Sequence, residues 1–140
     1  MINMQNTKAA IMVKPQTIGT TAVSGYIDTL GYDHLRVLYI GDTAVSTDVI
    51  TTLKLSEGDT TSAFTDISGG APSAIPAPNT STGDSIIFDV NLNAPRDRYV
   101  AINIVGDATT RLTSAIGILS RGAQAPDTDA LCGAAEIVYV

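Results

Sequence analysis

Histidine is the side chain best suited to acid–base chemistry near neutral pH, and this chain has a single one, His34. Asp33 precedes it in a turn-like stretch, so two members of a Ser-His-Asp site are adjacent. Such a site also needs a serine beside the histidine in space, and the sequence contains no Gly-x-Ser-x-Gly nucleophile elbow. We therefore interpret His34 as a turn or surface residue, and we predict that the protein is not an enzyme and has no catalytic residue.

Two short segments carry several oxygen side chains with the spacing of a metal loop, Asp127-x-Asp129 and Asp89-x-Asn91-x-Asn93. Calcium takes about six to eight oxygen ligands, and its best-known loop adds a glycine turn and a distal glutamate. Both segments lack those additions, and aspartate in a turn is explained by hydrogen bonds to its own backbone. One histidine and one cysteine are too few for zinc. We expect no metal and no cofactor.

Three further motifs have structural explanations. Asn79-Thr80-Ser81 matches the glycosylation acceptor pattern, but it carries little weight without a secretion signal. The charged run 96–98 is typical of the solvated start of a strand. Cys132 is the single cysteine, which excludes an intramolecular disulfide, and we expect it to be a small buried hydrophobe.

Length and composition favour one folded domain. The chain has 140 residues, of which 44% are hydrophobic and 16% charged, and this combination argues against disorder. The net charge of −6 disfavours binding to nucleic acid or to an anionic membrane surface. No apolar run approaches the roughly 18 residues of a membrane span, and the first residues lack the features of a signal peptide. We expect the chain to fold in a cytoplasm.

Alternating apolar and polar residues recur along the chain and predict strands. Gly-Asp pairs punctuate them as turn signals, and the long loop 69–84 suits a crossover between sheets. These patterns predict an all-β fold: a two-sheet antiparallel β-sandwich of jelly-roll type with about eight strands. The expected strands are 9–14, 20–28, 35–40, 49–57, 85–92, 98–105, 112–120 and 136–140.

Some of these strands have informative faces. Leu35, Val37 and Tyr39 alternate with Leu38 and Ile40, so this strand is apolar on both sides. A two-layer sandwich buries one face of each strand, so we predict that Leu38 and Ile40 meet a partner. Other predicted faces are Ala9, Ile11 and Val13; Val49, Thr51, Leu53 and Leu55; and Leu112, Ile116 and Ile118.

The N-terminal segment 1–15 is predicted to be an arm and first strand that ends at Pro15, because proline cannot donate to a β-ladder. Residues 16–140 would form the sandwich domain. An arm can bind by adding a strand to an exposed edge. The predicted interface residues are Ile2, Met4, Ile11, Val13, Leu38 and Ile40.

One stretch of the chain supplies a resemblance. Its parts are Tyr26-Ile27-Asp28-Thr29-Leu30-Gly31-Tyr32-Asp33, the apolar strand after it, Leu53-Lys54-Leu55-Ser56-Glu57-Gly58-Asp59, and Phe64-Thr65-Asp66-Ile67. About a third of the chain thus resembles small β-sandwich proteins of tailed bacteriophages and prophages, some of which are capsid decoration (cement) proteins. In that family Asp-Gly often follows the glutamate, whereas Thr60 follows Asp59 here.

The resemblance implies a structural virion protein that binds the outer surface of a phage head and stabilises contacts between capsomers. Its partners would be the phage major capsid protein and further copies of itself, as a homotrimer. It would be made in the bacterial host cytoplasm and reside on the capsid exterior. The family has no catalytic residues to transfer.

Two other functions compete with this one. The first is a carbohydrate-binding β-sandwich module of a virion fibre or surface protein, in which Tyr26, Tyr32 and Tyr39 would stack on sugars, although we expect core or interface roles for these rings. The second is a small enzyme, which only His34 supports. Sugar binding on a glycan array would favour the module.

Overall fold

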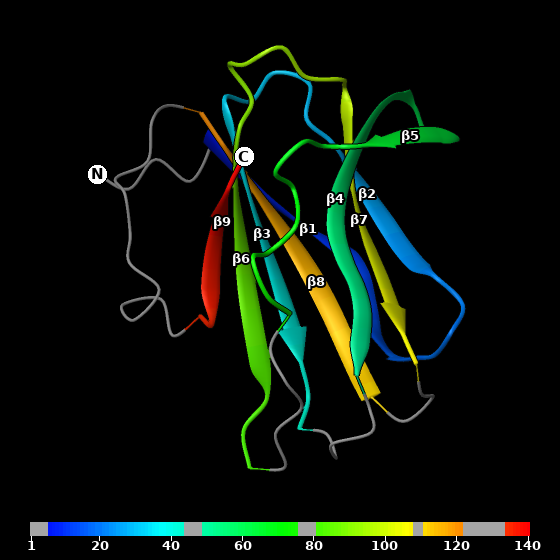
Figure 1. Ribbon diagram of the computed structural model, residues 1–140. Coiled ribbons are helices and arrows are strands. Elements are labelled where there is room, and N and C mark those ends of the chain that lie inside the picture. Colours follow the sequence, from blue (N-terminus) through cyan, green and yellow to red (C-terminus); the bar gives the residue numbers. More distant parts are fainter. Residues whose placement is uncertain (1–5, 44–48, 76–80, 108–110, 122–133) are drawn as a thin grey trace.

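The computed structural model describes residues 6–43, 49–75, 81–107, 111–121 and 134–140. In these ranges the chain forms nine β-strands and no helix, arranged as two stacked sheets (Figure 1). The all-β sandwich that the alternating patterns predict is therefore confirmed, with one strand more than expected.

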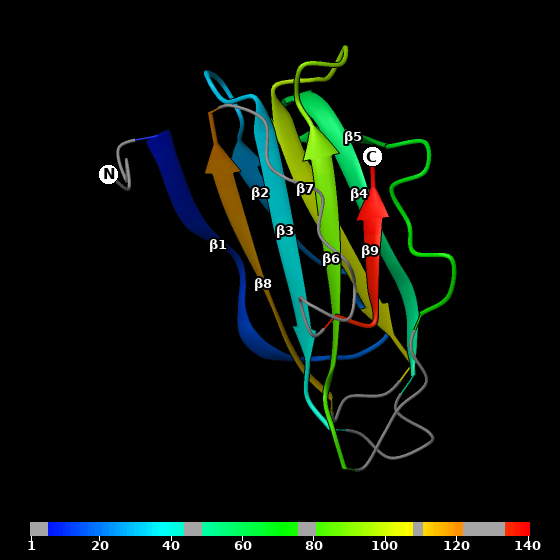
Figure 2. The same cartoon turned by 90° about the vertical axis from the view of Figure 1, so that its left-hand side faces the viewer.

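Sheet A has five strands in the order β1-β8-β3-β6-β9, seen side by side in Figure 2. Its neighbours are antiparallel except β6 and β9, which run parallel. The bounds are β1 Thr7–Ile18, β3 His34–Gly41, β6 Asp84–Asn91, β8 Arg111–Ser120 and β9 Glu136–Tyr139.

Sheet B has four antiparallel strands in the order β2-β7-β4-β5. The first eight strands enter the two sheets in the sequence A, B, A, B, B, A, B, A, and the long connection after β5 returns the chain to sheet A. The bounds are β2 Val23–Asp28, β4 Ile50–Thr60, β5 Ala63–Asp66 and β7 Tyr99–Gly106.

The core lies between the sheets, and its centre follows the predicted alternation. Inward residues of β3, β6 and β7 are fully buried, while their neighbours along each strand point outward. Burial of so many branched side chains supplies the main driving force for this fold. The central residues are Leu35, Val37, Tyr39, Ile86, Phe88, Val90, Val100, Ile102 and Ile104.

β1 differs from the prediction in length and in face. It continues past Pro15, so the predicted strand end is wrong. Its register against β8 shifts between Ile11 and Val13 and again between Val13 and Gln16. Proline is tolerated at such an irregularity on an edge strand. The first shift also buries Met12 beside Val13, while Ile11 is 64% exposed, so Ile11 and Val13 do not share a face.

From Thr7 onward the predicted arm is consequently part of the sandwich, because it lies in β1 and pairs with β8. Ile2, Met4, Asn79, Asp127, Asp129 and Cys132 lie outside the described residues.

β4 contains two irregularities that a regular alternation misses. A register shift against β7 between Ile50 and Thr52 puts Ile50 in the core, although the pattern assigns it to the opposite face. Leu53 and Leu55 are inward as predicted. Gly58 and the residue after it lie within β4, near a register shift against β5, and not in a turn.

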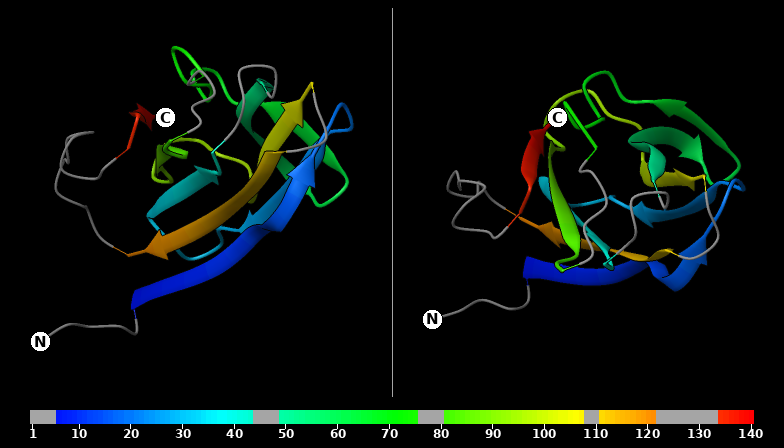
Figure 3. Two further views of the ribbon diagram at one scale, coloured as in Figure 1. Left: turned by 90° about the horizontal axis from the view of Figure 1, so that it is seen from below. Right: turned by 60° about the horizontal axis from the view of Figure 1, so that its bottom comes forward.

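One lateral side of the sandwich is closed by direct contact of β1 with β2 (Figure 3). A side chain at Gly25 of β2 would overlap the backbone carbonyl of Met12 in β1. Glycine is therefore required here to let two backbones approach.

Candidate interaction surface

The outer face of sheet A carries a row of aliphatic side chains that crosses all five strands. Ile11 of β1 pairs with Ile116 of β8, which pairs with Leu38 of β3. Leu38 pairs with Ile87 of β6, and Ile87 pairs with Ile137 of β9. Cross-strand neighbours on one face lie about 5 Å apart at Cβ, so the row is continuous.

Several side chains on this face are open to solvent. Ile11 is 64% exposed, Leu112 46% and Ile40 45%. The outer face of an antiparallel sheet is ordinarily polar when it meets water, and grouped exposed apolar side chains mark interaction sites. We define the apolar face as Ile11, Leu38, Ile40, Ile87, Leu112 and Ile116.

Two shallow recesses adjoin the apolar face, and both are lined by Ile40. One has a volume of about 270 Å³ and includes Pro15 and Leu112 in its lining. The other has about 260 Å³ and includes Leu38 and Ile87. The face is therefore uneven, with hollows that a protruding side chain of a partner could fill.

β8 explains why this face is apolar. Leu112, Ile116 and Ile118 do share a face, as predicted, but it is the outward one. The inward face of β8 is mostly small or polar, and its single large apolar side chain is Leu119, which is fully buried. Three of the four large apolar residues of β8 thus lie on the outward face.

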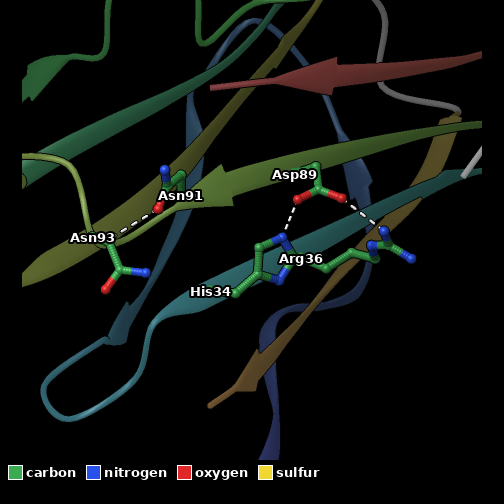
Figure 4. A network of polar contacts seen from close by, with 5 residues as sticks. All are labelled: His34, Arg36, Asp89, Asn91 and Asn93. Atoms are coloured by element: carbon green, nitrogen blue, oxygen red, sulfur yellow. Dashed lines mark hydrogen bonds and ion pairs between the residues drawn. The ribbon is translucent and has the colours of Figure 1, made fainter. Parts of the chain in front are cut away.

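A polar network borders the row at the end of sheet A where β3 begins (Figure 4). His34 Nε2 and Asp89 Oδ1 form a hydrogen bond, and Arg36 Nη2 donates to Asp89 Oδ2 at 2.7 Å. Their side chains are only 12–15% exposed. In the segment Asp89-x-Asn91-x-Asn93, the backbone N–H of Asn93 donates to Asn91 Oδ1. This cluster is fixed by its own contacts.

The structure brings a serine beside the histidine, which the sequence alone could not show. Ser120 of β8 pairs with His34 across the sheet, and Asp89, which is distant from His34 in the sequence, bonds to the imidazole. Within the described residues, however, His34 Nδ1 has no hydrogen-bond partner. The serine–histidine hydrogen bond of a nucleophilic site is therefore not made.

The outer face of sheet B has a different character, because it carries aromatic rings. Tyr26 is 50% exposed, and its ring centroid lies 6.0 Å from Phe64 and 5.9 Å from Tyr99. The guanidinium of Arg98 lies 5.1 Å from the centroid of Tyr99, a cation–π geometry. Contacts between strands, and not spacing along the chain, unite Tyr99 and Phe64 with Tyr26, so the sequence alone does not group these rings.

Arg98 also closes an ion pair at the edge of these rings. Its Nε and Nη2 donate to the two carboxylate oxygens of Asp28 at 3.1 and 2.7 Å. These bonds, together with the backbone N–H of Leu30, hold the pKa of Asp28 at about 2, below its usual 3.8. Arg98 is exposed and directly precedes β7, as predicted for the solvated start of a strand, and its guanidinium is in addition paired with Asp28.

The other residues named from sequence are placed as follows. Val13 is 2% exposed in the core, where no partner can reach it in the folded chain. Tyr39 is fully buried and cannot stack on a sugar. Tyr32 lies beneath Arg121, whose guanidinium is 5.6 Å from the ring centroid. Of the predicted interface residues, Ile11, Leu38 and Ile40 meet on the apolar face.

In the described ranges, no three potential metal ligands of the His, Cys, Asp or Glu type are grouped together. The same ranges contain no helix with the length and hydropathy needed to span a membrane. Comparisons of the chain with protein-family models, with curated proteins and with solved structures found no match.

Proposed function

We propose that this protein is a structural component of a bacteriophage virion. It binds the outer surface of the head, contacts the major capsid protein and stabilises the junctions between capsomers. The apolar face is its docking surface. The observation that carries this proposal is the aliphatic row across the outer face of sheet A, on the side of the sandwich where water would favour polar residues.

The sequence resemblance also supports this proposal. The resembling segments, from Tyr26 onward, fall in β2, β3, β4 and β5, and they include two residues of the apolar face, Leu38 and Ile40. The strand orders 1-8-3-6 and 2-7-4-5 are those expected if two Greek keys are wound together. We therefore also propose a jelly-roll classification, with β9 added to one edge.

Self-association is the second part of the proposal, with a homotrimer as the expected form. Two copies that each carry a charge of −6 repel each other. None of the six residues of the apolar face is charged, so copies can approach there with the least repulsion. Closed symmetric assembly buries part of such a face and leaves the rest to contact the head, and the threefold preference comes from the family resemblance.

A particle-binding experiment tests the docking surface. Purified phage heads that lack this protein are incubated with the wild-type chain or with Leu112→Asp, and the bound fraction is measured after sedimentation of the heads. Leu112 is 46% exposed on the apolar face, while the matched control Leu30→Asp lies in the β2–β3 turn at 69% exposure. We expect the first variant to lose binding and the control to keep it. Equal binding of both variants would show that the apolar face is not the docking surface.

Carbohydrate binding is a second candidate, favoured by one observation. The half-exposed Tyr26 and its neighbours Tyr99 and Phe64 lie on the outer face of sheet B, opposite the apolar face. Aromatic rings beside polar groups suit sugar rings. Glycan-array binding that is lost in Tyr26→Ala would support it, and an array without reproducible signal would exclude it.

A further inference from the structure

A second cluster of polar side chains lies on the inner face of sheet A, at the end where β3 stops and β8 begins. Asp84, Gly41 and Thr113 are neighbours across β6, β3 and β8. Tyr39 and Arg111 flank this row. Tyr39 is fully buried, and the side chain of Arg111 is 2% exposed. Thr113 is also 2% exposed, and the Asp84 side chain 10%.

The internal contacts of this cluster leave several polar atoms without partners. Arg111 Nη2 donates to Asp84 Oδ1. Among the described residues, no hydrogen bond reaches Asp84 Oδ2, the Tyr39 hydroxyl, the Thr113 hydroxyl, or Nε and Nη1 of Arg111. A buried polar atom without a partner costs about 1–3 kcal/mol, and buried polar atoms in native proteins are nearly always bonded.

The geometry around Gly41 shows that these groups converge on one place. A Cβ atom at Gly41 would lie 2.7 Å from the Tyr39 hydroxyl and 2.9 Å from Arg111 Nη2, and it would overlap Asp84 Oδ1. The absence of a side chain at Gly41 is therefore what lets the three polar groups meet. Gly41 and Thr113 also contribute to the lining of the recess of about 270 Å³ described above.

The chemistry of the free atoms selects the ligand. Arg111 Nε and Nη1 can only donate, Asp84 Oδ2 can only accept while ionised, and the two hydroxyls can do either. An anion would bond to Arg111 but would be repelled by the Asp84 carboxylate. A cation would bind the carboxylate but would be repelled by Arg111. Water donates and accepts, and buried waters typically make two to four such bonds. We propose that ordered water molecules bind between Arg111, Tyr39, Asp84 and Thr113 as a permanent part of the fold.

A crystal structure of the wild-type chain, at a resolution that shows ordered solvent, tests this directly. The expected result is density for water within hydrogen-bond distance of the Tyr39 hydroxyl and of Arg111 Nε or Nη1. Two results would overturn the proposal. One is a dry cluster in which the Tyr39 hydroxyl bonds directly to Asp84, and the other is density for an ion in place of water.

Thermal unfolding of Tyr39→Phe provides a test with a sign. If a water molecule bonds to the Tyr39 hydroxyl, removal of the hydroxyl leaves that water without one of its hydrogen bonds. The Tm should then fall by about 2–6 °C. If the hydroxyl is dry and unbonded, its removal relieves a penalty, so an unchanged or higher Tm would contradict the proposal. The matched control is Tyr26→Phe, which removes a hydroxyl from a half-exposed tyrosine and should leave the Tm unchanged.

Discussion

Individual glycines decide where backbones of this sandwich can touch. Gly25 is the clearest case, because its Cα faces the carbonyl of Met12 in the neighbouring edge strand. Backbone atoms cannot move aside as a flexible side chain can, and interiors this closely packed resist small changes in volume. The contact of β1 with β2 therefore depends on the absence of one methyl group.

Gly25→Ala should destabilise the fold by more than about 3 kcal/mol, because the added methyl overlaps a carbonyl and must push β1 away from β2. Chemical denaturation followed by circular dichroism measures the change. Gly69→Ala is the comparison: its surroundings are open and its φ is +77°, so only backbone strain of about 1–2 kcal/mol is expected. If the two variants lose similar amounts of unfolding free energy, β1 can move away from β2 at little cost, which would contradict the prediction.

The contribution of the Asp28–Arg98 ion pair to stability is predicted to depend on pH. The folded-state pKa of Asp28 is about 2, below its usual 3.8. The pair therefore stabilises the fold above about pH 4, and its contribution is lost as the pH falls through 2. An NMR titration of the Asp28 carboxyl measures this pKa directly.

Replacement of the arginine tests the cause of that shift. Arg98→Gln should raise the pKa of Asp28 toward 3.8, whereas Arg96→Gln, whose arginine pairs with Glu57, should leave it near 2. A wild-type pKa close to 3.8 would mean that the bidentate contact does not persist in solution.

At the scale of elements, regular strands were predictable and irregular ones were not. β3, β6 and β7 alternate strictly, so their inward residues could be read from the sequence. β1 and β4 contain register shifts, and a shift of one residue exchanges the two faces. No local pattern near Pro15 or Ile50 marks such a shift, because it depends on the partner strand.

The candidate site was only partly accessible from sequence for a related reason. Leu38 and Ile40 were found because β3 is apolar on both sides. Ile116 was recognised as part of an apolar face, but alternation does not say which face of a strand is inward. The polar and small residues of β8, from Arg111 to Gly117, fill the inner face, which only the assembled sheet reveals.

This assignment of β8 can be tested by paired substitutions of adjacent residues. Ala115 is fully buried, so Ala115→Asp places a charge in the core and should cost more than about 3 kcal/mol. Ile116 is half-buried on the outer face, and Ile116→Asp should cost about 1–2 kcal/mol with the fold retained. Circular dichroism and thermal melts compare them. If Ile116→Asp unfolds while Ala115→Asp does not, the faces of β8 are reversed.

At the scale of the whole molecule, the two outer faces of the sandwich differ in character. Sheet A presents its apolar face, whereas sheet B presents aromatic rings beside ion pairs. A monomer with this surface exposes aliphatic groups to water, and the small share of charged residues does little to offset them. The protein is therefore expected to bury its apolar face in an assembly.

Analytical ultracentrifugation at micromolar concentration should show an oligomer, with a trimer as the expected mass. Leu38→Asp, in the centre of the aliphatic row, should shift the protein to monomer because a charge is then buried at the interface. Leu30→Asp is the matched control and should remain oligomeric. A monomeric mass for the wild-type protein would contradict association in free solution. An unfolded Leu38→Asp variant would show that Leu38 supports the core.

The pairing of β1 with β8 also determines when the protein can fold. Thr7 lies opposite Ser120, so β1 leaves the ribosome more than a hundred residues before the strand it pairs with, and its ladder cannot close until then. Such distant pairing makes all-β domains slow, with folding times of about milliseconds to seconds. During that delay β1 is an unpaired strand that exposes Ile11, Met12 and Val13, and neighbouring nascent chains can capture it. If many copies of this protein are synthesised at once, a chaperone that shields β1 would therefore be expected to increase the fraction that folds.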